Sequence, residues 1–159
     1  MISSNETHKS VLLLGYGNPS RGDDGLGPAL LEMIEEERAL GRVADIFDAL
    51  TDYQLQIEHA LDMQKRQLVV FIDASLSATA PFDYSRLEPC RDNSYTTHAI
   101  SPAALLTVYE QVCGEPLPDA YLLGISAYQF DLGTSITAQA GEHLGEARDF
   151  VRELLLQYS

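Results

Sequence analysis

The sequence predicts an α/β fold, a three-layer α/β/α sandwich whose mostly parallel sheet has about five strands and carries helices on both faces. Two observations predict it. Apolar runs alternate along the chain with stretches that repeat apolar residues at helical spacing. One run, QLVVFI at 67–72, is apolar on both faces, which is typical of the buried middle of a parallel sheet. We expect residues 1–159 to form a single domain, with 1–9 as a flexible tail.

The elements follow one another in a regular order. In the first half of the chain we expect, in turn, a strand, a helix, a strand, a short helix and the central strand, at 11–15, 27–40, 43–47, 54–63 and 67–72. In the second half we expect an edge strand, a helix, a strand and a closing helix, at 83–87, 102–113, 120–125 and 138–158. Pro102 opens its helix and Gly114 ends it. The polar, turn-rich stretch 74–101 is long enough to predict a functional loop.

Composition excludes several classes of protein. Ten Lys and Arg stand against 24 Asp and Glu, and the resulting net charge of -14 repels nucleic acids and anionic membrane surfaces. No stretch approaches the roughly 18 apolar residues of a membrane span, and the N-terminus does not read as a signal peptide. The two cysteines, Cys90 and Cys113, have no CxxC partner, so neither a disulfide framework nor a cysteine zinc site is expected. We therefore expect a cytoplasmic protein that binds neither nucleic acid nor membrane.

Polar residues that could carry chemistry follow three of the predicted strands. The loop GYGNPSRGDDGLG holds Asp23 and Asp24, Asp73 closes the central strand, and His98 lies in the long loop. Ligands of open α/β sheets bind beyond the carboxyl ends of the strands. Taken alone, each residue has a structural explanation: an aspartate can cap a helix or a turn, and a loop histidine can satisfy a hydrogen bond. Two carboxylates and one imidazole together suit a divalent ion such as nickel or zinc.

Other candidates are weaker. The remaining histidines are expected in the tail or solvated on helices (His8, His59 and His143). Gly15 and Gly17 begin a dinucleotide fingerprint, and Asp48 is expected at the end of the second strand, where a ribose-binding acid would lie. Ser20 replaces the third glycine, however, and two aspartates occupy the helix start that a pyrophosphate would need. Nucleotide binding is therefore disfavoured.

The order of these motifs resembles the hydrogenase maturation proteases, the endopeptidases that trim the large subunit of nickel-iron hydrogenases. The resemblance spans residues 11 to about 155 and rests on LGYGNPSRGDDGLGP, QLQIEHA, VVFIDAS, THAISPAALL, GEPLPDAYLLGI and FDLGTSIT. By family position, the ligand acid six residues after Asn18 is Asp24, which leaves Asp23 as the expected helix cap; the second acid is Asp73, and the histidine is His98. One motif departs from the family: many members carry Asp-Gly-Gly-Thr where this chain has DALT at 48–51.

The resemblance implies a function and a partner. It implies an endopeptidase that removes the C-terminal extension of a hydrogenase large-subunit precursor and recognises the nickel already inserted there. Asp24, Asp73 and His98 would be both its catalytic residues and its metal ligands, and other divalent ions could occupy the site in vitro. The absence of HExxH, GxSxG or a cysteine beside a base is consistent with this. The alternative is a non-catalytic nickel-binding or chaperone-like maturation factor of the same fold. No dimer interface is evident, and a monomer is expected.

Overall fold

The computed structural model describes residues 9–90 and 100–159. Five strands form one sheet: β1 (Val11–Tyr16), β2 (Phe47–Asp52), β3 (Leu68–Ser75), β4 (Phe82–Arg86) and β5 (Asp119–Ser126). Four α-helices and one 3-10 helix accompany them: η1 (Gly22–Gly25), α1 (Leu26–Ala39), α2 (His59–Asp62), α3 (Pro102–Cys113) and α4 (Ala138–Gln157). The predicted α/β class is confirmed.

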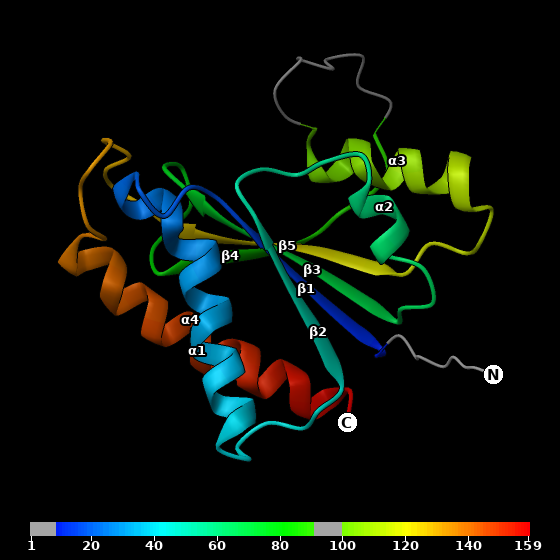
Figure 1. Ribbon diagram of the computed structural model, residues 1–159, viewed down its shortest axis with the longest axis horizontal. Coiled ribbons are helices and arrows are strands. Elements are labelled where there is room, and N and C mark those ends of the chain that lie inside the picture. The colour runs from blue at the N-terminus through cyan, green and yellow to red at the C-terminus, as the bar shows by residue number, and fades with distance from the viewer. Residues whose placement is uncertain (1–8, 91–99) are drawn as a thin grey trace.

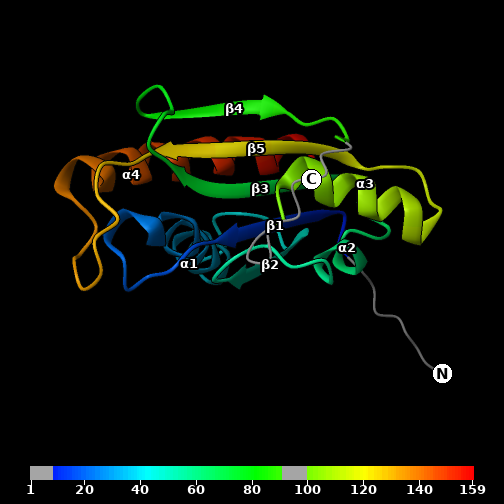
Figure 2. The ribbon, with the colours of Figure 1, turned by 90° about the horizontal axis from the view of Figure 1, so that it is seen from above.

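The sheet has the strand order β2-β1-β3-β5-β4. All neighbouring pairs are parallel except β4 with β5, and the β4 arrow points the opposite way at the sheet edge in Figure 2. The chain goes from β1 to β2 on one side and then places β3 on the other side of β1. This change of direction makes the carboxyl ends of β1 and β3 the topological switch point, where open α/β sheets bind ligands.

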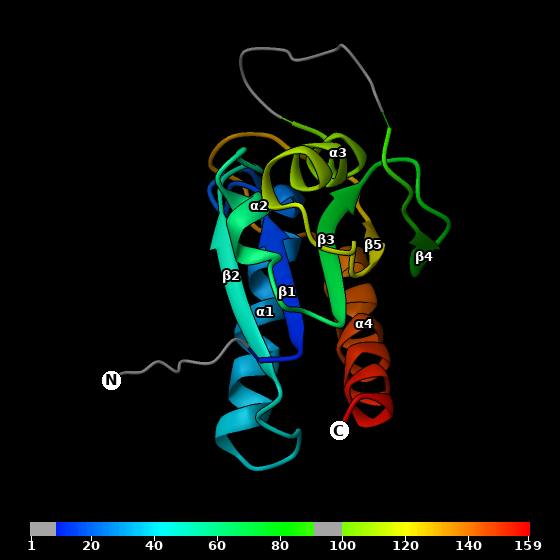
Figure 3. The same ribbon diagram turned by 90° about the vertical axis from the view of Figure 1, so that its right-hand side faces the viewer.

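Helices cover both faces of the sheet (Figure 1). One apolar cluster joins α1 and α4 to every second strand residue, a set that includes Leu13 and Val70. The other joins α2 and α3 to the opposite alternation, which includes Leu14 and Phe71. Helices α2 and α3 lie side by side in Figures 1 and 3 and contact each other. Because side chains of a strand alternate between faces, each strand residue can be assigned to the α1/α4 side or the α2/α3 side.

Several predicted boundaries are confirmed by the local geometry. Pro102 opens α3, the Ser101 Oγ accepts the N–H of Ala104 at 3.1 Å, and Gly114 ends the helix with φ 62°. The expected edge strand at 83–87 is β4, one residue earlier. In the described part of the chain, no helix is both long and apolar enough to cross a bilayer.

Three boundaries were predicted wrongly. The second strand runs from Phe47 rather than ending there, because residues 47–52 are the ones that pair with β1. As an edge strand, β2 is only partly buried, so its apolar pattern is weak. Val43 is buried in the loop before β2, and its apolar character shifted the predicted strand toward the N-terminus. The helix expected at 54–63 is reduced to a single turn, His59–Asp62. Asp73 does not close β3, since pairing with β5 continues to Ser75.

Candidate functional site

The loop after β1 folds back so that Asp24 lies at the strand end. The Asp24 Oδ2 accepts the N–H of Asn18 at 2.8 Å. Gly17 makes this approach possible, because its φ is 143° and a Cβ there would lie 1.9 Å from the Asp24 carbonyl oxygen. The start of α1 also packs closely against β3, since a Cβ on Gly27 would lie 2.7 Å from the Ile72 carbonyl oxygen. The loop therefore brings a carboxylate against the ends of β1 and β3.

Asp73 lies near the carboxyl end of β3, on the α2/α3 side of the sheet. Burial raises the pKa of its carboxyl group to about 6; the N–H of Ala74 opposes this rise, the charge of Asp24 adds to it, and the Tyr16 hydroxyl opposes it. Tyr16 is on the same face at the end of β1, and burial together with Asp73 raises its own pKa well above the usual value. The Tyr16 phenol is therefore protonated and donates toward Asp73. Sequence reasoning missed Tyr16, although its position at the strand end was a usable signal.

The structure brings two of the three sequence-predicted site residues together. The charge of Asp24 acts on the Asp73 carboxyl group, and both lie at the switch point between β1 and β3. His98 lies outside the described residues. Within 9–90 and 100–159, no group of three or more His, Cys, Asp or Glu side chains could hold a metal ion. The described part of the candidate site is thus a pair of carboxylates with a phenol beside it.

Asp23 does not cap a helix, which corrects the role that its sequence position suggested. No side chain caps η1 or α1. The Asp23 side chain is fully buried and accepts four hydrogen bonds: from the N–H groups of Tyr128 (2.8 Å) and Gln129 (3.2 Å), and from the N–H (2.7 Å) and hydroxyl (3.0 Å) of Thr137. It therefore anchors segment 127–137 to the loop after β1, and its neighbour Asp24 is the residue left at the site.

Other sequence-derived assignments also change. His59 is buried rather than solvated; its Nδ1 accepts the N–H of Gln56 at 2.8 Å, and its Nε2 lies 3.5 Å from Asp52. His143 is also largely covered, with its Nε2 2.7 Å from the Tyr128 hydroxyl. Both histidines lie on helices as expected, and each is held by a side chain or backbone partner that the sequence pattern did not reveal. His8 lies outside the described residues.

Asp48 also has a different place from the one predicted. It is the second residue of β2 rather than the last, and it forms an ion pair with Arg66. Parallel strands place their starts at the edge of the sheet opposite the switch point. Asp48 is therefore far along the strand from the loop after β1, which removes the ribose-binding position that the dinucleotide interpretation needed.

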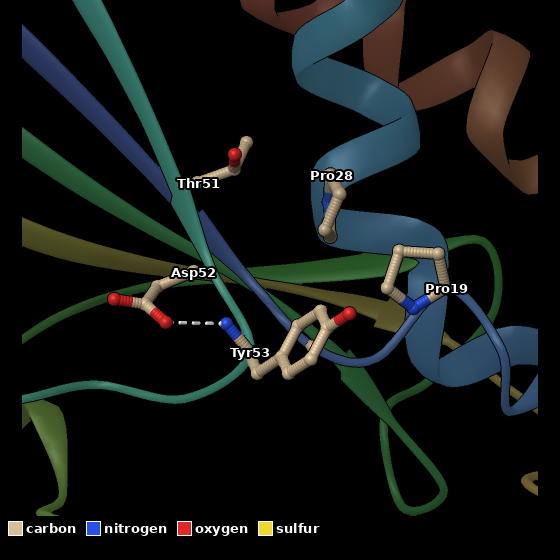
Figure 4. A pocket seen from close by; sticks show the side chains of 6 residues that line it. Pro19, Pro28, Thr51, Asp52 and Tyr53 are labelled. Atoms are coloured by element: carbon tan, nitrogen blue, oxygen red, sulfur yellow. Dashed lines mark hydrogen bonds between the residues drawn. The ribbon is translucent and has the colours of Figure 1, made fainter.

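A cavity of about 290 Å³ lies between the loop after β1 and the end of β2 (Figure 4). Pro19 and Pro28 face Thr51 and Tyr53 across it, and the Asp52 carboxylate accepts the N–H of Tyr53 at 2.7 Å. The DALT segment that departs from the family motif is part of β2, and its last residue, Thr51, lines this cavity. A second cavity, of about 260 Å³, lies beside Asp73.

Comparisons with known proteins identify the fold. No family model matches the chain, and no curated protein matches it by sequence. Solved structures do match. The hydrogenase maturating endopeptidase HybD from E. coli superposes with a TM-score of 0.71 at 22% identity, over 94% of this chain and 93% of that one. The [NiFe] hydrogenase maturation protease HycI from Thermococcus kodakarensis KOD1 gives 0.68 at 20%, over 92% and 93%.

A third structure extends the comparison. The hydrogenase 2 maturation peptidase from a Thaumarchaeota archaeon gives a TM-score of 0.65 at 23% identity, over 92% of this chain and 98% of that one. The chain therefore has the fold of the hydrogenase maturation proteases, along nearly its whole length.

Proposed function

We propose that this protein is an endopeptidase that removes the C-terminal extension of a nickel-iron hydrogenase large-subunit precursor. The observation that carries the proposal is the pairing of Asp24 and Asp73 at the switch point of this fold. These are the two acids that the sequence resemblance singles out, and they lie 49 positions apart in a chain whose motifs follow the family order. A fold alone does not define a function, so the pair of carboxylates is what connects fold and chemistry.

Nickel belongs to the substrate in this proposal. Asp24 and Asp73 would contribute carboxylate oxygens toward it, and His98, which precedes α3 in the sequence, would contribute an imidazole nitrogen. Three protein ligands leave coordination positions for groups of the precursor. A metal ion in such a site polarises a carbonyl group or lowers the pKa of a bound water. Recognition of the metal would restrict processing to precursors in which nickel has been inserted.

The chain's own groups support hydrolysis at this place. A carboxyl group with a pKa of about 6, as in Asp73, accepts a proton more readily than an ordinary aspartate and is still mostly ionised at pH 7.5. It therefore suits either a ligand or a general base. The Tyr16 hydroxyl is beside the same carboxyl group. The N–H of Asn18 donates to Asp24 and orients its carboxylate.

Incubation with nickel-loaded large-subunit precursor tests the function. We expect mass spectrometry to show loss of one short C-terminal peptide, and no loss from the same precursor prepared without nickel. Asp73→Asn and His98→Ala should both abolish the loss, whereas Asp149→Asn, an exposed change on α4, should not. If the nickel-loaded precursor stays intact with the wild-type protein as well as with the three variants, the endopeptidase proposal is wrong.

Metal titration separates the protease from a non-catalytic nickel-binding factor. Both predict one principal site for nickel, cadmium or zinc in calorimetry, weakened by Asp73→Ala or His98→Ala. Only the protease also shortens the precursor. Unchanged affinity in both variants would contradict a shared site.

Because coordination needs a neutral imidazole, affinity should fall between about pH 7 and pH 5.5 if His98 is a ligand.

A further inference from the structure

A second group of polar side chains lies on the α1/α4 side of the sheet. Tyr128 comes two residues after the end of β5, and His143 is on α4. The Tyr128 hydroxyl lies 2.7 Å from the His143 Nε2, and the centroids of the two rings are 5.8 Å apart. The proposed peptidase chemistry uses neither residue. This contact joins the segment after β5 to the closing helix.

Glu146 determines which nitrogen of His143 carries the proton. Its Oε2 lies 3.8 Å from the His143 Nδ1, one turn further along α4. This Nδ1 is buried and, within residues 9–90 and 100–159, has no hydrogen-bond partner. A proton on Nδ1 faces the Glu146 carboxylate, whereas a lone pair there would face its negative charge. The Nδ1–H tautomer is therefore favoured, and the lone pair of Nε2 is left to accept the Tyr128 proton.

The hydrogen bonds of the Tyr128 hydroxyl favour loss of its proton. The Ser126 Oγ donates to the phenol oxygen at 3.5 Å, while the phenol donates to His143. A donor on this oxygen stabilises the negative charge that forms when the proton leaves. Glu146, His143 and Tyr128 thus follow the order acid, base and nucleophile of side-chain triads, in which a third group orients the base.

The backbone holds Tyr128 in place while its side chain stays accessible. The N–H of Tyr128 donates to the buried Asp23 carboxylate at 2.8 Å, and the N–H of Ala127 donates to the Ser75 carbonyl oxygen at 2.9 Å. Tyr128 is nevertheless 44% exposed. A nucleophile that is already oriented and faces solvent can react with a molecule that arrives from solution.

The charge around the phenol selects the class of reagent. Residues 127–147 contain three acidic side chains, Asp131, Glu142 and Glu146, and no Lys or Arg. This segment would repel a nucleotide or another phosphorylated donor, and it has no basic side chain to hold the phosphates. A neutral ester meets no such repulsion.

We propose that Tyr128 is a nucleophilic site that accepts an acyl group from a neutral activated ester, with His143 as general base and Glu146 as the residue that positions His143. The Tyr128 oxygen attacks the carbonyl carbon, and its proton passes to the His143 Nε2. The bond between the carbonyl carbon and the alcohol oxygen then breaks, and the alcohol leaves with the proton. The products are an acyl ester on Tyr128 and a free alcohol. This site is independent of the proposed peptidase function.

Acetylation by p-nitrophenyl acetate tests the nucleophile. Tyr53 is the internal control, because it is 69% exposed and accessibility alone would make it the faster of the two tyrosines. Tandem mass spectrometry of the digested protein should show Tyr128 acetylated at least about 10-fold faster than Tyr53, since a general base contributes roughly 100-fold or more in enzymes. Equal rates, or a faster reaction at Tyr53, would overturn the proposal.

The variant His143→Gln separates a general base from a structural contact. The Gln amide oxygen can still accept the phenol hydrogen bond, but it cannot take up the proton. Acetylation of Tyr128 should therefore fall to within about twofold of that of Tyr53, whose own rate should not change. If Tyr128 reacts in His143→Gln as fast as in the wild type, His143 is not the base and the proposal fails.

Nitrogen NMR of the His143 ring tests the role of Glu146, because a merely structural role would not change the tautomer. At about pH 8, where an ordinary imidazole is neutral, we expect the Nδ1–H form in the wild type and more of the Nε2–H form in Glu146→Ala. Glu153→Ala removes an exposed charge elsewhere on α4 and should leave the tautomer unchanged. A wild-type ring in the Nε2–H form, or the same tautomer in Glu146→Ala as in the wild type, would contradict the proposed relay.

Discussion

The two faces of the sheet differ at the carboxyl ends of the strands: one is covered by a loop segment and the other has a cavity. On the α1/α4 side, segment 127–137 covers the loop after β1 and is anchored by the buried Asp23 carboxylate. On the α2/α3 side, Asp73 lies beside an open cavity and has Tyr16 next to it. Adjacent residues of one loop serve the two faces: Asp23 completes the closed side, while Asp24 is at the open one. The comparison teaches that the contacts of Asp23 on the α1/α4 side hold the loop that positions Asp24. The structural role of Asp23 and the chemical role of Asp24 can therefore be separated by substitution.

Loss of the Asp23 anchor should have the largest effect. Asp23→Ala leaves three buried N–H groups and one hydroxyl without their acceptor, and we expect the free energy of unfolding to fall by about 3 to 5 kcal/mol. Asp23→Asn should still cost about 1 to 3 kcal/mol, because both carboxylate oxygens accept hydrogen bonds and an amide NH₂ would face one of the donors. Urea denaturation gives these values. Asp24→Asn is the control, with an expected change below about 1 kcal/mol; equal losses at positions 23 and 24 would remove the distinction between the two faces.

On the α2/α3 side, the charge of Asp73 should destabilise the folded state. Removing this charge should therefore stabilise the protein, by less than the loss of Asp23 destabilises it. The Asp73 pKa rises from 3.8 to about 6 on folding, so the folded state binds the proton more tightly and stability falls as pH rises through about 4 to 6. At pH 7.5 the ionised carboxylate costs up to about 3 kcal/mol. Asp73→Asn should therefore raise the free energy of unfolding by about 2 kcal/mol at pH 7.5 and by little at pH 4. Urea denaturation at pH 4 and at pH 7.5 measures both values. A gain of equal size at the two pH values, or a loss at pH 7.5, would contradict an ionised carboxylate that burial destabilises.

The smallest effect is expected where segment 127–137 joins α4. The Thr137 hydroxyl accepts the N–H of Ala140 at 3.2 Å as a helix cap and also donates to Asp23. Thr137→Val keeps the shape and removes both bonds, so we expect a loss of about 1 to 2 kcal/mol in urea denaturation. Thr137→Ser keeps the hydroxyl and should stay within about 0.5 kcal/mol of the wild type. A Thr137→Val variant as stable as Thr137→Ser would show that the hydroxyl contributes nothing to the anchor.

Local sequence patterns predicted the parts of the fold that local physics determines. The continuous apolar runs gave β1, β3 and β5, and Pro102 with Gly114 gave the ends of α3. The general rule that residues after parallel strands meet at one edge of the sheet pointed to Asp73 and to the loop with Asp23 and Asp24, and the family resemblance singled out Asp24.

Long-range contacts account for what the sequence could not predict. The groups that donate hydrogen bonds to Asp23 are 105 to 114 positions away in the sequence, so only the folded chain shows that Asp23 is an anchor rather than a cap. The true position of β2 depends on pairing with β1. The cavity beside Asp73 depends on the register that aligns Asp73, Gly124 and Asp83 across three strands.

The rate at which Asp24→Asn processes nickel-loaded precursor tests the central claim most directly. Asn keeps the size of the side chain and changes only its charge and one oxygen, and the Asp24 side chain contributes a single described hydrogen bond to the loop. The account predicts a fold as stable as the wild type within about 1 kcal/mol. It also predicts a processing rate reduced by more than about 100-fold, because loss of a ligand should exceed the roughly 10- to 100-fold effect of losing an outer-shell partner. A processing rate within about threefold of wild type would contradict it and would take Asp24 out of the site.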